Sequence, residues 1–398
     1  MKKLNIVIVS TLYPNTADPA RGVFTAQMVK KLKNLCNVIV ISPLPWFPKN
    51  SFLNSINLFK KWNIFSKVSD DTIDGVQVYY PRYIVIPGIL SYSHSFFMSV
   101  PLFFCIRRLN KQRKIDLINT HWVFPDGVAS TIISKILKIP NILVALGCDI
   151  THFPALSFRK KQITWALKNS ASLMAVSEDL GQRMIKLGAG PSKIKLAPDG
   201  VDFGKFHVVD RILCREKLGL PQDKKIILQV ASLDEVKGGK YLIRAVSLLK
   251  ESEKNVCVYF VGDGHLKHLL IKQSKELGVE KIISFVGRIP HDEIPLWMNS
   301  ADTFCLSSIR EGRPNVLLES IACGVPVVAT AVGGVPEIIN PDNGYLAEST
   351  NAQDIADKLY KVLNREWIRE SISSTVSHLT WETAADIYFS EYLSVLNQ

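Results

Sequence analysis

Short apolar runs rich in Val and Ile recur along the chain with helical stretches between them, and this pattern restricts the possible folds more than any other feature. Runs without polar alternation are typical of parallel strands that helices cover on both faces. The first half therefore predicts a doubly wound α/β domain. Its runs lie at residues 4–10, 37–42, 76–80, 115–120, 141–146, 172–177 and 193–198.

The same pattern restarts in the second half, which predicts a second Rossmann-like domain. We expect a cleft between the two domains, with ligands at the carboxyl ends of the strands. A Pro, Asp and Gly-rich turn at 197–207 suggests domains over 1–200 and 201–379. An amphipathic helix at 380–398 would return to the first domain. The second set of runs lies at 225–232, 255–262, 281–287, 301–308 and 325–330.

The net charge of +12 is distributed unevenly along the chain. Residues 1–200 carry 26 Lys and Arg against 10 Asp and Glu, a net charge of +16, whereas residues 201–398 carry 22 against 26, a net charge of −4. So basic a half indicates an anionic partner, with a merely solvated surface as the alternative. Aromatic and basic residues alternate at 46–67 and 95–114, which favours contact with an anionic membrane surface, or else core packing under long loops. No nucleic-acid-binding module is recognised.

The seven cysteines are scattered without a C-x-x-C pair, so neither a disulfide framework nor a zinc site is expected. The apolar stretch 84–106 contains Pro87, His94 and Pro101, which argue against a membrane span. No A-x-A-like cleavage site follows the first apolar run. We expect a cytoplasmic protein, peripheral on the inner face of the cytoplasmic membrane.

The stretch EGRPNVLLE, residues 311–319, places two carboxylates eight positions apart around an expected helix start. Pro314 lacks an N–H group and suits the first helical turn, which puts Glu311 in the preceding loop and Glu319 on the second turn. Carboxylates there could accept hydrogen bonds from sugar and ribose hydroxyls. The alternative is an ordinary cap and an exposed helix residue. Free N–H groups that would form an anion site at this helix start belong to Asn315, Val316 and Leu317.

Residues 311–339 resemble the E-x7-E signature of the retaining family 4 glycosyltransferases, which have the GT-B fold of two Rossmann-like domains. The resemblance extends over almost the whole chain. Residues 230–246 are similar to the family's diphosphate loop, and 285–302 to the segment beside the nucleotide base. Segments at 10–32, 120–130 and 145–153 resemble the branch that builds bacterial surface polysaccharides, teichuronic-acid enzymes included.

The resemblance implies transfer of a sugar, with retention, from a nucleoside diphosphate donor to a lipid-linked or growing cell-surface polysaccharide precursor. Lys237 would neutralise the diphosphate as a catalytic cation, Glu311 would hold the donor sugar, and Glu319 the ribose. Further donor contacts implied by the resemblance fall on Gly22, Ser232, Gly262, Gly264, Arg288, Ile289, Gly312, Asn315, Val316 and Leu317.

Two positions depart from the family pattern. Ser232 stands where an Arg usually precedes the diphosphate lysine, and Leu146 stands where a His is common. A catalytically weak or inactive homologue that binds nucleotide or glycan as an assembly partner is therefore the alternative function. His121 and Asp149 are the remaining polar candidates for catalysis in the first domain, with structural roles as the alternative. Arg313 occupies a position that is usually apolar in the family.

No D-x-D occurs, and no His, Asp or Glu cluster has metal-ligand spacing. We therefore expect a reaction without a metal or a cofactor other than the donor. The G-x-G of Gly262 and Gly264 is not completed, because Lys267 occupies the last position, so a dinucleotide site is not expected.

Overall fold

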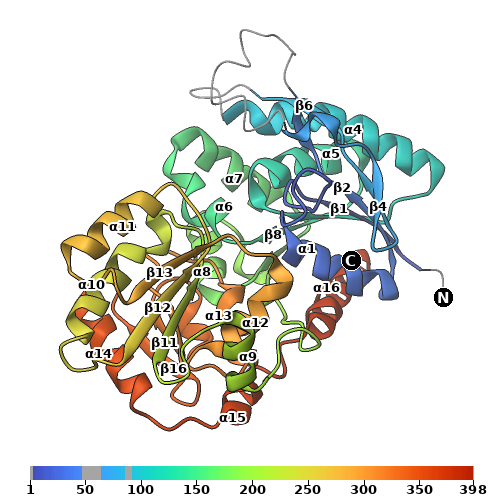
Figure 1. Ribbon diagram of the computed structural model, residues 1–398. Coiled ribbons are helices and arrows are strands. Elements are labelled where there is room, and N and C mark those ends of the chain that lie inside the picture. The colour runs from blue at the N-terminus through green and yellow to red at the C-terminus, as the bar shows by residue number, and fades with distance from the viewer. Residues whose placement is uncertain (1–2, 47–63, 86–91, 398) are drawn as a thin grey trace. The chain divides into compact units, whose positions relative to one another are not determined.

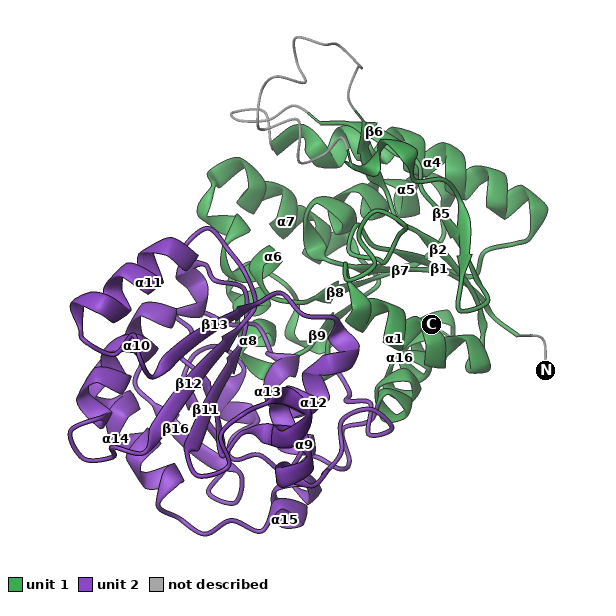
Figure 2. Cartoon of the chain, viewed as in Figure 1, with its two compact units in different colours: residues 1–198, 381–398 green, residues 199–380 purple. Residues whose placement is uncertain are grey.

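The computed structural model describes residues 3–46, 64–85 and 92–397, and the chain divides into two compact units (Figure 2). Unit 1 comprises residues 1–198 and 381–398, and unit 2 comprises residues 199–380. The boundaries expected from the sequence followed residues 200 and 379. Of the segment 46–67, only Trp46 and residues 64–67 fall within the described part of the chain.

Unit 1 is built on an eight-stranded sheet with the order β10-β9-β8-β7-β1-β2-β5-β4. All neighbours are parallel except β4 and β5, which pair antiparallel at one edge. A separate parallel pair, β3 and β6, lies outside this sheet. The strands are β1 Asn5–Val9, β2 Asn37–Ile41, β3 Leu44–Trp46, β4 Asp71–Ile73, β5 Val76–Tyr79, β6 Arg82–Ile84, β7 Leu117–His121, β8 Asn141–Ala145, β9 Ser172–Ala175 and β10 Ile194–Leu196.

Helices cover both faces of this sheet (Figure 1). Strand β1 is buried along its whole length: Ile6 and Ile8 join the larger core under α1, α7, α8 and α16, while Val7 and Val9 face α4 and α5. This arrangement explains an apolar run without polar alternation. The helices are α1 Val23–Leu35, α4 His94–Gln112, α5 Val128–Leu137, α6 Cys148–Thr151, α7 Ser157–Asn169, α8 Glu178–Lys186 and α16 Trp381–Leu396.

Unit 2 contains a six-stranded parallel sheet with the order β13-β12-β11-β14-β15-β16. One core lies between this sheet and α12, α13 and α15, and the other lies under α10, α11 and α14. The strands are β11 Lys225–Val230, β12 Val256–Val261, β13 Ile283–Gly287, β14 Thr303–Leu306, β15 Val327–Thr330 and β16 Gly344–Ala347. The helices are α9 Arg211–Leu218, α10 Gly239–Leu249, α11 Lys267–Glu276, α12 Ile294–Ser300, α13 Asn315–Ala322, α14 Ala352–Leu363 and α15 Arg369–Ser374.

The two doubly wound α/β units that the sequence predicts are confirmed, and every predicted strand run contains a strand. The sequence missed β16, whose run GYLA is short, and the peripheral strands β3, β4 and β6. β3 reads LPW, and its central proline lowers the strand signal.

Candidate functional site

The sheet of unit 2 has its switch point between β11 and β14. From β11 the chain proceeds outward through β12 and β13 and then returns to the other side of β11 as β14. The loops that leave β11 and β14 therefore diverge at the carboxyl edge, which is where open α/β sheets bind ligands. Lys237 follows β11 and Glu311 follows β14.

Lys237 and Glu311 meet at this switch point. Lys237 Nζ lies 2.7 Å from Glu311 Oε1, and the same oxygen accepts a hydrogen bond of 2.6 Å from Ser308 Oγ. The Glu311 side chain is 9% exposed and that of Lys237 is 26% exposed. A nearly buried carboxylate thus has two donors, while the ammonium group keeps an accessible side on which an anion could approach.

The loop that carries Lys237 is held by Asp234, which caps the single turn Glu235–Lys237. Asp234 Oδ1 accepts the backbone N–H groups of Val236 and Lys237 at 3.0 and 3.2 Å. Ser232 Oγ donates to the other carboxylate oxygen of Asp234 at 2.6 Å. Ser232 is exposed and supplies no charge. Lys237 is the cation of this loop that reaches Glu311, a contact that the sequence did not predict.

Helix α13 begins after Pro314 and carries Glu319 on its second turn, as predicted. Glu319 is buried with 5% exposure. The expectation that Leu317 offers a free N–H group is wrong, because that group donates to the Pro314 carbonyl at 3.1 Å. The N–H group of Leu317 is therefore already used within the first turn of α13. An anion site here would depend on Asn315 and Val316.

His291, which the sequence analysis did not select, lies beside Glu319. Its Nε2 atom lies 3.6 Å from Glu319 Oε1 and is buried without a hydrogen-bond partner among the described residues. Lys205 Nζ lies 2.6 Å from the other ring nitrogen and 2.6 Å from the carboxylate of Asp292. Phe206 packs edge-on against the ring. The sequence did offer one signal for His291: it directly follows Arg288, Ile289 and Pro290, in the segment already selected as a donor-contact region.

Arg313, whose role the sequence left open, binds the first segment of unit 2. Its Nη1 donates to the Asp199 carbonyl at 3.2 Å, and Asn315 Nδ2 donates to the Asp199 carboxylate at 3.0 Å. Burial raises the pKa of Asp199, against the opposing effects of Asn315 and Arg313. Burial also lowers the pKa of Arg313. The side chains of Arg313 and Asn315 tie the start of α13 to Asp199. Arg313 therefore has a structural role.

Gly262 and Gly264 follow β12 and pack against the loop after β11. A Cβ on Gly262 would lie 1.9 Å from the Ala231 carbonyl oxygen, and one on Gly264 would lie 2.3 Å from that of Leu233. Both positions require glycine for backbone packing even without a ligand. On the neighbouring loop, Arg288 is exposed, whereas Ile289 packs against the core. Gly312 accepts the backbone N–H of Gly334 at 2.8 Å.

The switch point of unit 1 lies between β1 and β7 and is occupied by Asp126. Its carboxylate accepts the N–H group of Thr11 at 2.5 Å and the Thr11 hydroxyl at 3.1 Å. Burial raises the pKa of Asp126 to about 7, although the bonds from Thr11 act in the opposite direction. Gly22, at the start of α1, has φ 61°, and a Cβ there would lie 2.1 Å from the Leu12 carbonyl oxygen. Local packing alone therefore accounts for this glycine.

His121 and Asp149 are both buried in unit 1 and satisfy internal groups. His121 Nε2 lies 3.2 Å from Asn119 Oδ1, and the ring stacks on Tyr388. Burial lowers the pKa of His121 to about 4, which leaves the ring neutral at physiological pH. Asp149 accepts the N–H groups of Val123 and Gly147 at 2.9 and 2.7 Å. These contacts favour the structural alternative for both residues, while their catalytic roles stay predictions.

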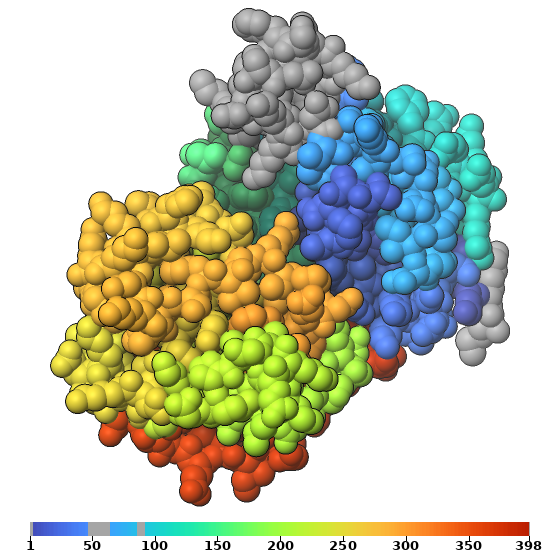
Figure 3. All heavy atoms as spheres, viewed as in Figure 1, coloured from blue at the N-terminus to red at the C-terminus, as the bar shows by residue number. Residues whose placement is uncertain are grey.

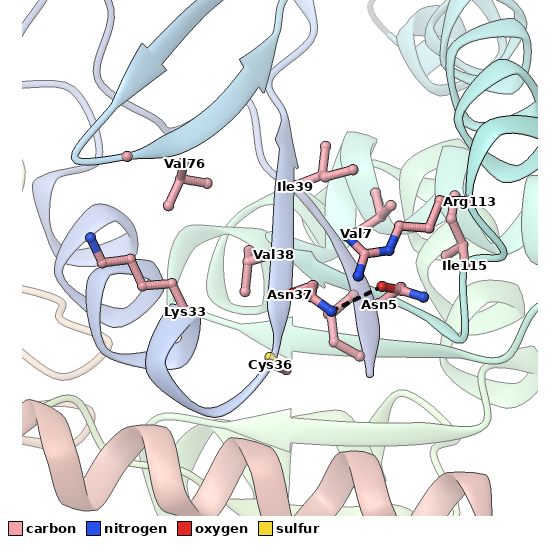
Figure 4. A pocket seen from close by; sticks show the side chains of 12 residues that line it. Asn5, Val7, Lys33, Cys36, Asn37, Val38, Ile39, Val76, Arg113 and Ile115 are labelled. Atoms are coloured by element: carbon pink, nitrogen blue, oxygen red, sulfur yellow. Dashed lines mark hydrogen bonds between the residues drawn. The ribbon is translucent and has the colours of Figure 1, made fainter. Parts of the chain in front are cut away.

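A cavity of about 270 Å³ in unit 1 opens at the amino-terminal ends of β1 and β2 (Figure 4). Asn5 and Asn37, the first residues of these strands, are joined by a hydrogen bond of 3.2 Å at its wall. Lys33 and Arg113 are its cationic lining residues. Ligands of open α/β sheets bind at the opposite, carboxyl edge, so this cavity is not the candidate site.

Two doubly wound parallel-sheet units, with charged residues gathered at a switch point, define the two-domain GT-B class. Within that class, residues 22–205 match the domain described as Glycosyltransferase Family 4, and residues 210–376 match the domain described as Glycosyl transferases group 1. The chain therefore belongs to the GT-B glycosyltransferases of this family 4, group 1 type. It is related to enzymes of surface polysaccharide biosynthesis.

Individual proteins agree with this assignment. The chain is 29% identical over 366 residues to a putative teichuronic acid biosynthesis glycosyltransferase, TuaC, of Bacillus subtilis, a match that covers 89% of this chain and 88% of that one. Sucrose-phosphate synthase of Thermosynechococcus elongatus superposes with a TM-score of 0.78 at 17% identity, covering 99% and 100% of the two chains. Anabaena HepE in complex with UDP superposes with a TM-score of 0.67 at 19% identity, covering 100% and 98%.

No helix within residues 3–46, 64–85 and 92–397 combines the length and the apolar character that a membrane-crossing segment needs.

Proposed function

We propose that this protein is a retaining glycosyltransferase that moves a sugar from a nucleoside diphosphate donor to a lipid-linked or growing surface-polysaccharide precursor. The pair of Lys237 and Glu311 at the switch point of unit 2 carries this proposal. In this proposal Lys237 would contact the diphosphate and Glu311 would accept hydrogen bonds from the sugar hydroxyls. The nucleotide in the HepE complex, UDP, supports a nucleoside diphosphate donor.

Lys237 would stabilise the negative charge that develops on the leaving diphosphate. Its ammonium group is already held beside the nearly buried Glu311 carboxylate, so little reorganisation is needed when that charge appears. The N-terminal turn of α13, with Asn315 and Val316, would add backbone N–H groups. With these contributions the transfer is proposed to be independent of a metal ion.

Glu311 and Glu319 would bind hydroxyl groups on two parts of the donor. Glu311 would accept from the transferred sugar, and Glu319, held beside His291, would accept from the ribose diol. Because no carboxylate is proposed as a covalent nucleophile, we infer front-face transfer. The bond between the anomeric carbon and the diphosphate oxygen breaks, the acceptor oxygen bonds to that carbon on the same face, and the acceptor proton passes to the departing phosphate.

The decisive experiment measures nucleotide release. The protein is incubated with UDP-, GDP- and ADP-sugars and a bacterial membrane lipid extract, in parallel with Glu319→Ala and with Glu366→Ala, an exposed glutamate of the same unit. Release by the wild type and by Glu366→Ala, with strong loss in Glu319→Ala, is the expected result. Binding of a nucleotide without release from any donor would instead support the assembly-partner alternative, which Ser232 and Leu146 motivate.

The acceptor is proposed to be presented at the inner face of the cytoplasmic membrane. The excess of Lys and Arg in residues 1–200 supports this location, since it gives that half a net charge of +16.

A further inference from the structure

Helix α4 presents an apolar stripe on the side that the core does not use. Phe96, Val100 and Phe104 follow one another at four-residue intervals and are 52%, 58% and 62% exposed. Residues four apart lie along one helix face, and this face is opposite to the buried row. The buried row comprises Ser95, Met98, Leu102, Ile106 and Leu109.

The same face becomes cationic toward the end of the helix. Arg107, Arg108 and Lys111 are exposed, and the helix sequence from 94 to 112 contains no Asp or Glu. The Arg107 guanidinium lies 5.9 Å from the centre of the Phe103 ring, at the border between the two parts. We call Phe96, Val100, Phe104, Arg107, Arg108 and Lys111 the α4 outer face.

Strands next to α4 also carry exposed apolar side chains. Strand β6 lies against α4, and its last residue, Ile84, is paired in register with Trp46 of β3. These two side chains are 48% and 47% exposed. Turquoise atoms of the α4 region reach the molecular surface in Figure 3. Large apolar side chains are thus exposed on adjacent elements and do not take part in the core of unit 1.

We propose that the α4 outer face docks unit 1 on an anionic lipid bilayer. Apolar side chains would enter the acyl boundary, and the three cations would contact lipid phosphates, which is how amphipathic helices bind membrane interfaces. The proposal rests on the proposed function, because it identifies the surface that would bring the enzyme to a lipid-linked acceptor. A second copy of the chain fits less well, because the stripe is one residue wide and a copy would bring its own cations to it.

Cosedimentation of the full chain with lipid vesicles tests this proposal. The probes are vesicles of phosphatidylcholine alone and vesicles with about one-third phosphatidylglycerol, at low and high salt. The wild type should sediment with the anionic vesicles at low salt. Phe96→Ser combined with Phe104→Ser should lower the affinity at least ~10-fold. Arg107→Gln combined with Arg108→Gln should lower it ~5-fold per cation and weaken its salt dependence.

The matched control is Leu269→Ser combined with Ile368→Ser in unit 2, where the side chains are 61% and 70% exposed. This variant should sediment like the wild type. UDP binding, measured on every variant, should be unchanged, so that failure of membrane docking is distinguished from failure of the proposed function. Near-ultraviolet circular dichroism checks folding, and the arginine variant carries the test if the phenylalanine variant misfolds.

Three results would overturn the proposal: no sedimentation of the wild type at low salt, wild-type affinity in both α4 variants, or equal loss in the unit 2 control. Sedimentation velocity without vesicles adds a fourth. A dimer that is lost in the Phe96→Ser and Phe104→Ser variant would assign the α4 outer face to a second copy of the chain.

Discussion

The two sheets have the same doubly wound construction, but their switch points use carboxylates differently. In unit 2, Glu311 lies beside Lys237 and Glu319 beside His291, and both partners keep accessible surface. In unit 1, Asp126 is fully buried, and both of its carboxylate oxygens accept hydrogen bonds from Thr11 of the same unit. The same topology therefore provides one edge suited to an external ligand and one whose acidic residue holds two loops together. The predictions below test this difference.

Lys237→Ala should produce the largest effect, because it removes the proposed leaving-group cation and leaves the nearly buried Glu311 with Ser308 but without its cationic partner. Turnover should fall by roughly 10²–10³-fold, the usual cost of losing a preorganised electrostatic group. Steady-state kinetics with the active donor measures this. Lys240→Ala, an exposed lysine three residues further on, is the control and should keep wild-type turnover. A loss below about threefold in Lys237→Ala would contradict the role given to Lys237.

Asp126→Asn should change the pH dependence of stability rather than the donor site. The folded pKa of Asp126 is about 7, against an ordinary value of 3.8. The stabilisation due to the protonated carboxyl is fully present below pH 3.8 and is lost as the pH rises through 7. The wild type should therefore lose roughly 2–3 kcal/mol of unfolding free energy between pH 5 and pH 8 relative to Asp126→Asn.

Urea denaturation at pH 5 and pH 8 measures this difference. Asp386→Asn, which changes an exposed carboxylate on α16, is the control and should leave the pH profile unchanged. If Asp126→Asn followed the wild-type profile, Asp126 would be ionised in the folded protein, and the contrast between the two switch points would disappear.

Glu319→Ala should weaken nucleotide binding by roughly 10–150-fold, since charge-assisted hydrogen bonds contribute about 1.5–3 kcal/mol. Isothermal titration calorimetry with UDP, or with the nucleotide of the active donor, gives the dissociation constant directly. A matched comparison with the 2′-deoxynucleotide sharpens the assignment. If Glu319 binds the ribose diol, the wild type should discriminate against the deoxy form and the variant should not.

His291→Ala should have the smallest effect, because His291 acts on the donor only through Glu319. We expect KM for the donor to rise ~3–5-fold with little change in kcat, the pattern of a positioning residue. His291→Gln, whose amide can still donate toward Glu319, should recover part of the loss. Equal losses in both variants, or a fall in kcat alone, would remove His291 from this role.

Much of the fold could be predicted because buried parallel strands leave a local signal. Runs such as 4–10 and 225–232 are apolar on both faces, and each became a central strand. The strands that escaped prediction, β3, β4, β6 and β16, lie at sheet edges or outside the main sheets. Their residues are only partly buried, so the sequence is less constrained there.

The order of residues along the chain determined the helix after Pro314 and the placement of Glu311 and Glu319 around its start, whereas the choice of Lys237 as the cation came from the family resemblance. The first two depend on chain-local chemistry: a missing N–H group, a turn and a short strand. Tertiary structure alone decided that Lys237 reaches Glu311 across 74 positions of sequence, that His291 lies beside Glu319, and that Arg313 and Asn315 bind Asp199. Such pairs form because separate strands end at one sheet edge, and neither the pairing of those strands nor the burial of their loops is written in any single segment.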